Sequence, residues 1–429
     1  MFLNLGLGRM GCLAGALAAS SLALDLNFID GSAFSSLITF TRASTATYYD
    51  AAGQRQTASS GSPRIDYNPA TLAIRGLLIE EQRTNLALQS GTESDAAWTK
   101  TATTIGTGAT GLDGVTASRR MTSSSTTPLL AQGSITVTAS TTYTYSVFLR
   151  YVDTNWLRIQ YMDSTFTNGV RAWVNLNGGG AAALGTVANI GTGSGGAHTL
   201  TSLGGGWYLY TLTGMASTAT AAGPSIRPVT ADVSSTGVSG VSYDADGHQL
   251  EAGSFATSYI PTTGTSATRA ADVAVVSGAN FSGFYNSAAG AFVVSGHTTD
   301  SFSGVTRRLM EVNNGTAGER FIVGLQNATT ARFLVSDGAA TVADVGIAVT
   351  SMPARVVIAG SYAANDVKAA ANGAAGTADT SVTLPTVTQM VIGADLASPT
   401  ATQMANGHIE RIRYYNRALS QAELNALTA

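Results

Sequence analysis

The sequence predicts an all-β protein made of two antiparallel, jelly-roll-like β-sandwiches in series behind an N-terminal attachment segment. Segments that alternate apolar and polar residues with a period of two are separated by glycine-rich turns, without a helical period between them. A chain of 429 residues is too long for one core, so more than one domain is expected. Charged residues make up only 11% of the chain and glycine contributes 48 residues, which suits tight turns and closely packed sheets.

Residues 1–24 are predicted to be an attachment segment that docks on another protein. The stretch from Met10 to Ala23 is apolar and small, as in a secretory signal, but Arg9 is its only flanking cation and glycines interrupt it. The same glycines and the short length argue against a transmembrane helix. The residues expected to bury against the partner are Phe2, Leu3, Leu5, Leu7 and Met10.

Residues 25–90 are predicted to form a connector unit, in which Leu24–Phe28 has the pattern of a short strand. Glu80 and Glu81 are adjacent, so in a strand their carboxylates would point to opposite faces. They are therefore a poor acid/base pair, and local pairing with Arg83 is the expected role.

Residues 91–265 are predicted to form the first sandwich. Thr142–Arg150 alternates in the manner of a half-buried strand, and Trp156–Tyr161 and Trp207–Leu212 are further strand candidates. Val241–Glu251 has the pattern of a closing strand.

Residues 273–429 are predicted to form the second sandwich, which ends in a short helix. Ser420 and Glu423 have the spacing of a capping box, so the helix is expected to begin there. The predicted strands are Ala291–Val294, Arg320–Leu325, Ala331–Val335, Arg355–Ala359 and Gln389–Gly393.

Five segments carry a resemblance to a known group of proteins: Phe40–Asp50, Pro63–Tyr67, Arg75–Leu86, Gly247–Thr262 and Thr268–Asp272. They resemble a junction that recurs in tailed-bacteriophage virion proteins, between a carbohydrate-binding-like sandwich and a C-terminal laminin-G or concanavalin-A-like domain. The resemblance covers residues 40–90 and 240–429, whereas residues 95–240 match only in general pattern.

The resemblance implies a structural virion protein of the tail-fibre or receptor-binding type, whose distal sandwich contacts host surface glycans without catalysis. A capsid decoration or head-fibre protein is the alternative, and a polysaccharide depolymerase is a second one. The protein would be made in the host cytoplasm and displayed on the virion surface, head or tail, bound to other virion proteins through its N-terminal segment. Because single sugar contacts are weak, a homo-oligomer is expected, with a trimer favoured.

Charge and cysteine content exclude other classes of function. The net charge is −3, and Lys100 and Lys368 are the only lysines, so neither nucleic-acid binding nor membrane insertion is expected. Cys12 is the only cysteine, so no intrachain disulfide can form and stability must come from packed cores or from oligomerisation.

No catalytic motif is present. Gly191–Gly196 matches a dinucleotide fingerprint by letter only, because neither a helix nor a suitably spaced acid follows it. The paired-carboxylate strand of laminarinase-type glycosidases is absent. The histidines lie far apart in the sequence, none with a second ligand at zinc spacing: His198, His248, His297 and His408.

Sugar binding without chemistry is the stronger candidate, since sugar rings stack on exposed aromatic side chains. All four tryptophans fall in the first sandwich, where most are expected to fill the core. Trp173 is the predicted exception, flanked by Arg171 and Asn175 and followed by a glycine-rich loop.

Asp244 and Asp246 are the candidate ligands of a structural calcium ion. At i and i+2 in a strand, their carboxylates would share one face, and calcium prefers oxygen ligands. No other cofactor is expected.

Overall fold

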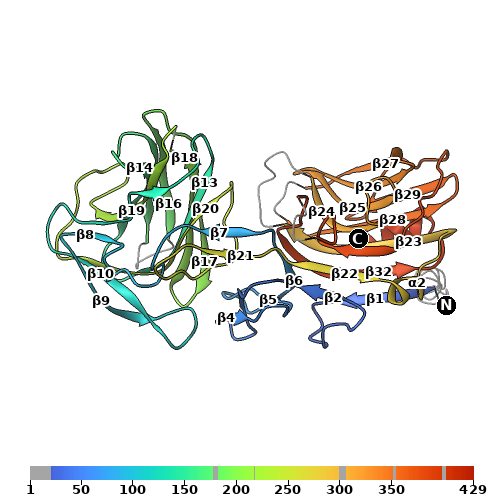
Figure 1. Cartoon of the computed structure of the whole chain (residues 1–429), viewed down its shortest axis with the longest axis horizontal. Helices are drawn as coiled ribbons and strands as arrows, with labels where there is room; N and C mark the ends of the chain where they lie inside the picture. Colours follow the sequence, from blue (N-terminus) through green and yellow to red (C-terminus); the bar gives the residue numbers. More distant parts are fainter. Residues whose placement is uncertain (1–20, 177–181, 217, 299–305, 351–353, 399–401) are drawn as a thin grey trace, which may run out of the picture.

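The structure is a computed structural model that describes residues 21–176, 182–216, 218–298, 306–350, 354–398 and 402–429. The predicted all-β fold class is confirmed. Two β-sandwiches lie side by side, and the strands β7 (Arg83–Asn85) and β21 (Ala267–Arg269) pair where the chain passes between them (Figure 1). The described helices are α2 (Ala279–Ser282) and α3 (Gln421–Thr428).

The middle sandwich contains two antiparallel sheets around one core. The predicted apolar face of Thr142–Arg150 is confirmed, because Tyr145, Val147 and Leu149 lie together in that core. The strand is not half-buried as predicted, since Thr144, Ser146 and Phe148 on its other face are buried as well. The six-stranded sheet has the order β17 (Ser194–Gly204), β18 (Trp207–Met215), β13 (Tyr143–Tyr151), β20 (Ser242–Ala252), β10 (Ala117–Ser123), β9 (Thr103–Thr110). The seven-stranded sheet has the order β16 (Ala183–Ile190), β15 (Gly169–Asn175), β14 (Trp156–Asp163), β19 (Ala221–Val229), β11 (Leu129–Ala131), β8 (Thr99–Thr101), with β12 (Ile135–Thr136) beside β19.

The C-terminal sandwich has a larger core and ends in α3. The predicted capping box is confirmed, because Ser420 and Glu423 cap α3 reciprocally. Its eight-stranded sheet has the order β30 (Ala374–Ala375), β29 (Asp366–Ala371), β28 (Val356–Ala363), β23 (Ala289–Thr298), β32 (Gly407–Tyr415), β6 (Ile74–Ile79), β5 (Ile65–Tyr67), with β1 (Leu22–Asn27) also on β32. Its seven-stranded sheet has the order β2 (Thr39–Thr41), β22 (Val273–Ser277), β31 (Gln389–Ile392), β24 (Arg307–Asn313), β25 (Arg320–Asn327), β26 (Thr330–Asp337), β27 (Ala340–Ala348).

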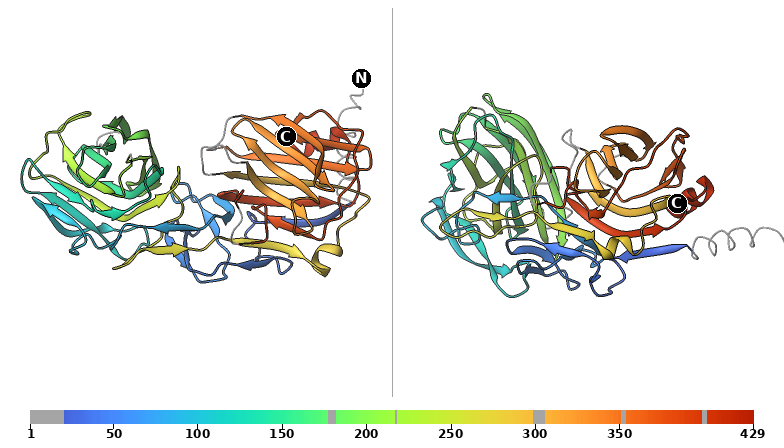
Figure 2. Two further views of the ribbon diagram at one scale, coloured as in Figure 1. Left: turned by 45° about the horizontal axis from the view of Figure 1, so that its top comes forward. Right: turned by 45° about the vertical axis from the view of Figure 1, so that its right-hand side comes forward.

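The segment predicted as a connector is built into the C-terminal sandwich. β1 and β6 both pair with β32, and β2 pairs with β22, while β3 (Ala46–Tyr49) and β4 (Arg55–Ala58) form a separate ribbon. Figure 2 shows these N-terminal strands, in blue, against the orange and red strands of that sandwich. Phe28 and Leu77 lie in its core. The middle sandwich is therefore inserted into a sandwich that both ends of the chain assemble.

The predicted boundary of the attachment segment at residue 24 is wrong. β1 begins at Leu22, and Leu24 is buried in the C-terminal core at 6% exposure. The proposed anchor residues, Phe2, Leu3, Leu5, Leu7 and Met10, lie outside the described residues.

A buried ion-pair network, which we call the hub, joins the N-terminal segment to the chain that returns from the middle sandwich. Asp272 accepts hydrogen bonds from Arg42 (3.0 Å) and from Arg64 (2.6 Å) through different carboxylate oxygens. Arg64 also pairs with Glu80 at 2.8 Å, and Arg269 lies 3.4 Å from the same carboxylate. All five side chains are at most 6% exposed. Isolated charges cannot be buried at acceptable cost, so these segments must come together to neutralise one another.

Glu80 extends the hub to the loop after β20. Ser258 donates two hydrogen bonds to its carboxylate, from the backbone N–H (2.8 Å) and from the hydroxyl (2.6 Å). Burial alone would raise the pKa of Glu80, but Arg269, Arg64 and Ser258 outweigh it and lower that pKa to about 2. Glu81 points away and pairs with Arg83 at 2.6 Å, as the sequence predicts.

Two histidines that are far apart in the sequence are neighbours in the eight-stranded sheet. His297 of β23 lies opposite His408 of β32, and their rings stack at 4.7 Å between centroids. His408 Nε2 lies 2.8 Å from the Asp66 carboxylate. The pKa of His297 is lowered to about 3, mainly by burial and further by the charges of His408 and Arg75.

Replacing Asp272 with alanine should lower the free energy of unfolding by about 3–5 kcal/mol, because three arginines would remain buried with one carboxylate. Urea denaturation followed by circular dichroism measures this loss. The matched control is Asp344→Ala, which breaks an exposed pair with Arg332 and should cost less than about 1 kcal/mol. Equal losses in the two variants would show that the hub has no special role.

Acid should destabilise the protein through His297. The folded-state pKa lies below the unfolded value, so the unfolded state binds more protons and stability falls as the pH drops from about 6.5 toward about 3. The groups that face His297 are His408, Asp66, Arg75 and Arg355. His297→Gln should flatten the dependence of the melting temperature on pH between about 7 and about 4. An unchanged profile in this variant would contradict the assignment.

Candidate functional site

The outer face of the seven-stranded sheet in the middle sandwich carries the candidate site. Alternate residues of β14, including Leu157 and Ile159, point into the core, so Arg158 and Gln160 point to the opposite face. Strand register then places similar polar residues beside them on β15 and β19.

Three arginines occupy adjacent positions on this face. Arg158 lies opposite Arg227 of β19, and in the next row Gln160 lies between Arg171 of β15 and Ser225 of β19. We call these five residues the arginine face. The strands that carry them (β15, β14 and β19) are consecutive in the sheet.

Hydrogen bonds hold one row of the arginine face in place. Arg171 Nε donates to the Gln160 side-chain oxygen at 2.5 Å, and the Gln160 amide nitrogen donates to the Ser225 hydroxyl at 3.0 Å. Gln160 and Ser225 are almost fully buried, at 3% and 2% exposure. The Arg171 side chain is therefore oriented by a buried pair.

The other two arginines have no such support. Arg158 is only 6% exposed, yet its Nε finds no hydrogen-bond acceptor in the described part of the chain, and neither does Nε of Arg227. No carboxylate of a described residue forms an ion pair with Arg158, Arg171 or Arg227.

Burial and mutual repulsion both act on these guanidinium groups. Burial lowers the pKa of Arg158 to about 9, with a further contribution from Arg227 and Arg171. Burial also lowers the pKa of Arg171 and of Arg227, the latter assisted by the charge of Arg171. All three remain charged at neutral pH, so the face presents hydrogen-bond donors without a compensating acid.

The sequence prediction for this region is partly wrong. Trp173 lies in the same row as Arg158 but is only 3% exposed, and its indole N–H donates to the Ser234 carbonyl at 2.9 Å. A covered ring cannot stack on a sugar, so the predicted role of Trp173 as a stacking platform is wrong. Arg171 and Asn175 both lie on this face, Asn175 at the end of β15 in the row beyond Trp173.

Trp156 is the half-buried tryptophan of this face, opposite Asn175 and Val229. Trp98 and Trp207 are buried, as expected of core residues. Arg158 and Arg227 were not predicted as site residues from the sequence. The polar positions Arg158 and Gln160 in an otherwise apolar strand were a usable signal, whereas the prolines on either side of Arg227 concealed a strand.

The calcium prediction for Asp244 and Asp246 is wrong. Asp244 is fully buried and accepts hydrogen bonds from Arg120 (2.8 and 3.2 Å), Arg150 (3.3 Å) and the Ala109 N–H (3.1 Å). Asp246 pairs with Arg55 at 2.9 Å. Arginines thus occupy both carboxylates, and the described residues contain no group of three acids, histidines or cysteines that could hold a metal ion.

A histidine–glutamate pair in the middle core has catalytic residue types but no access. His248 Nε2 lies 3.0 Å from Glu93, and its Nδ1 lies 2.6 Å from the Tyr145 hydroxyl. All three residues are fully buried. Since a substrate cannot reach them, they are a structural feature of the core.

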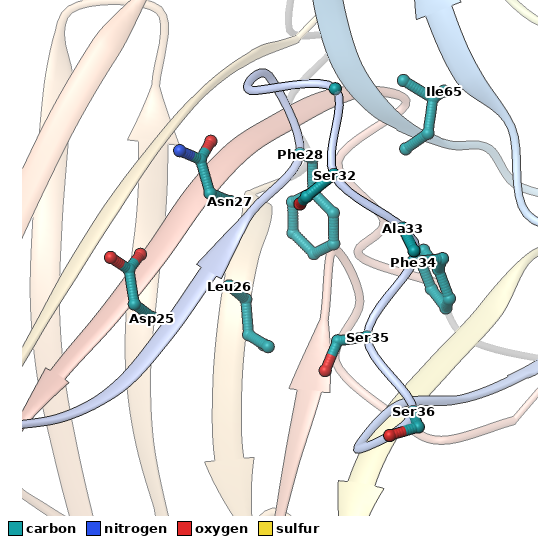
Figure 3. Close-up of a pocket in the computed structure, with 11 residues that line it drawn as sticks. Asp25, Leu26, Asn27, Phe28, Ser32, Ala33, Phe34, Ser35, Ser36 and Ile65 are labelled. Atoms are coloured by element: carbon teal, nitrogen blue, oxygen red, sulfur yellow. The ribbon is translucent and has the colours of Figure 1, made fainter.

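A cavity of about 420 Å³ lies between β1 and the loop that follows it (Figure 3). Residues 25–36 supply nearly all of its lining. Its only charged lining residue, Asp25, already forms a two-bond pair with Arg411. The cavity therefore offers a ligand fewer free charged groups than the arginine face does. No helix in the described part of the chain is long and apolar enough to span a membrane.

No protein-family model and no curated protein matches the chain. Several solved structures are similar to about a third of it. The CBM40 domain of the Ruminococcus gnavus IT-sialidase bound to α2,3-sialyllactose has a TM-score of 0.31 and 21% identity, covering 35% of this chain and 88% of that one. The leech intramolecular trans-sialidase complexed with 2,7-anhydro-Neu5Ac has a TM-score of 0.31 and 18% identity, covering 35% of this chain and 24% of that one.

The receptor-binding domain of botulinum neurotoxin mosaic serotype C/D is also similar, with a TM-score of 0.28 and 11% identity over 37% of this chain and 39% of that chain. These similarities are confined to the β-sandwich architecture.

Proposed function

We propose that this protein binds glycans without catalysis and does so through the arginine face of its middle sandwich. The observation that carries the proposal is a group of three arginines in two adjacent rows of one sheet face, for which no described residue supplies a carboxylate. Arg171 and Arg227 are half-buried and supply directional hydrogen bonds that sugar hydroxyl and ring oxygens accept, while the buried Gln160 holds Arg171 in place. Trp156, half-buried at the end of the same face, adds an aromatic surface.

We further propose that the protein is displayed on a virion surface as a tail-fibre or receptor-binding protein. The segments that resemble phage virion proteins support this location, and they include the residues of the hub. In this proposal the N-terminal residues dock on another virion protein, and a homo-oligomer, with a trimer favoured, raises avidity by about 10²–10⁴ over one weak contact. A capsid decoration or head-fibre protein would use the same architecture.

The full chain should be retained on a column of host surface polysaccharide and release no reducing ends from it. Arg227→Ala should lower the affinity at least about tenfold, since it removes charge-assisted hydrogen bonds. The matched control, Arg332→Ala in the C-terminal sandwich, should bind like the wild type because Arg332 already pairs with Asp344. Equal retention of the two variants would exclude the arginine face as the binding site, and release of reducing ends would show catalysis.

Immunogold labelling of intact particles with antibody against residues 273–429 tests the proposed location. Gold confined to the tail tip is the expected result for a receptor-binding protein. Gold spread over the capsid would favour the decoration or head-fibre alternative, and gold on neither would contradict the virion assignment.

A further inference from the structure

We infer that the arginine face selects an acidic sugar, whose anionic group binds between Arg158 and Arg227. This inference rests on the proposed function and names the class of ligand that the same site takes.

Most of the other described arginines pair with a carboxylate, although Arg119 and Arg413 form no such pair among the described residues. Ten examples, from both sandwiches, have a carboxylate within ion-pair distance: Arg42, Arg55, Arg64, Arg83, Arg120, Arg150, Arg332, Arg355, Arg411 and Arg417. What distinguishes the arginine face is that three arginines without an acid lie on neighbouring strands of one sheet. In a protein with net charge −3, such a cluster concentrates positive potential at one place.

Strand register fits the cluster to a compact anion. Residues directly opposite each other on antiparallel strands have Cα atoms about 4.5–5.5 Å apart, so the stems of Arg158 and Arg227 start side by side. Two neighbouring guanidinium forks match the oxygens of one carboxylate or sulfate group. Arg171, one row away and oriented by Gln160, is then placed to donate to a neighbouring hydroxyl of the same sugar.

Burial makes the missing acceptor costly. Arg158 is 6% exposed and its Nε has no acceptor among the described residues, so water compensates it poorly. An anionic ligand would supply the acceptor and relieve the repulsion among the three cations. A neutral sugar would supply hydrogen bonds but leave the repulsion in place.

The cluster is too small for an extended polyanion. Nucleic-acid binding depends on many cations spread along a backbone, and this chain has two lysines and only three arginines on this face. The observations therefore favour an acidic sugar over a nucleic acid.

Dissociation constants measured by saturation-transfer NMR on the full chain test the inference. The probes are D-glucuronate, D-galacturonate and N-acetylneuraminate, each compared with an uncharged counterpart: D-glucose, D-galactose and the methyl ester of N-acetylneuraminate. At least one acid should bind about tenfold or more tightly than its counterpart, with an affinity that falls as salt is added. D-glucose 6-sulfate distinguishes a sulfated from a carboxylated ligand, and preferential binding of either anion supports the inference.

Arg227→Gln should abolish the preference for the acid, whereas Arg332→Gln should leave it unchanged. Arg158→Met provides a second variant with a distinct readout. If Arg158 serves the ligand rather than the fold, removing an unpaired buried charge should not lower the melting temperature. A clear drop in that temperature would overturn the assignment of Arg158.

The outcomes separate this inference from the proposed function. Acids that bind no better than their neutral counterparts overturn the inference, and retention on host polysaccharide that Arg227→Ala weakens would still support glycan binding. Tighter binding of an oligonucleotide than of any acidic sugar would also overturn the inference. Loss of both retention and probe binding would remove the proposed function as well.

Discussion

The carboxylate of Asp272 is the constraint on which the assembly of this chain depends. It neutralises Arg42 and Arg64, which precede the middle sandwich in the sequence, although Asp272 itself follows that sandwich. Because a buried guanidinium without a partner is costly, the network forms only when the chain has returned and β22 has paired with β2. Glu80 then ties in Ser258 from the loop after β20. The hub thus closes the C-terminal sandwich at the point where the middle sandwich leaves and re-enters it.

The arginine face differs from the hub in that its arginines have no carboxylate partners among the described residues. In the hub, each buried arginine has a carboxylate within ion-pair distance. In the middle sandwich, Asp244 likewise forms ion pairs with Arg120 and Arg150. Arg158 and Arg227 have none among the described residues. Under the proposed function, an anionic ligand would offset the repulsion among these cations, because a ligand that binds only the folded state stabilises it.

The sequence was informative where the controlling interactions are local. The apolar face of Thr142–Arg150 and the spacing of Ser420 and Glu423 depend on near neighbours, and the structure confirms both. That the opposite face of Thr142–Arg150 is also buried depends on remote segments. The insertion of the middle sandwich, the pairing of β1 with β32 and the stacking of His297 on His408 depend on pairings across hundreds of residues or on sheet order. For the same reason flanking residues favoured Trp173 over Trp156, since nothing near Trp173 in the sequence reveals that Ser234 covers it. Asp244 and Asp246 suggested calcium because their arginine partners are likewise remote.

The spatial order of the two sandwiches determines which of them would project from the virion in the proposed adhesion. Although the middle sandwich precedes the C-terminal sandwich in most of the sequence, β1 starts at the end of the C-terminal sandwich that lies away from the middle one (Figure 1). If the N-terminal residues dock on a virion, as we propose, the middle sandwich with its arginine face is the part that projects outward. Two passes of the chain, β7 and β21, pair with each other at the junction and connect directly to the hub. Such a double connection restricts the orientation of the middle sandwich more than a single linker would, and restricted orientation lowers the entropic cost of each additional contact in a multivalent attachment.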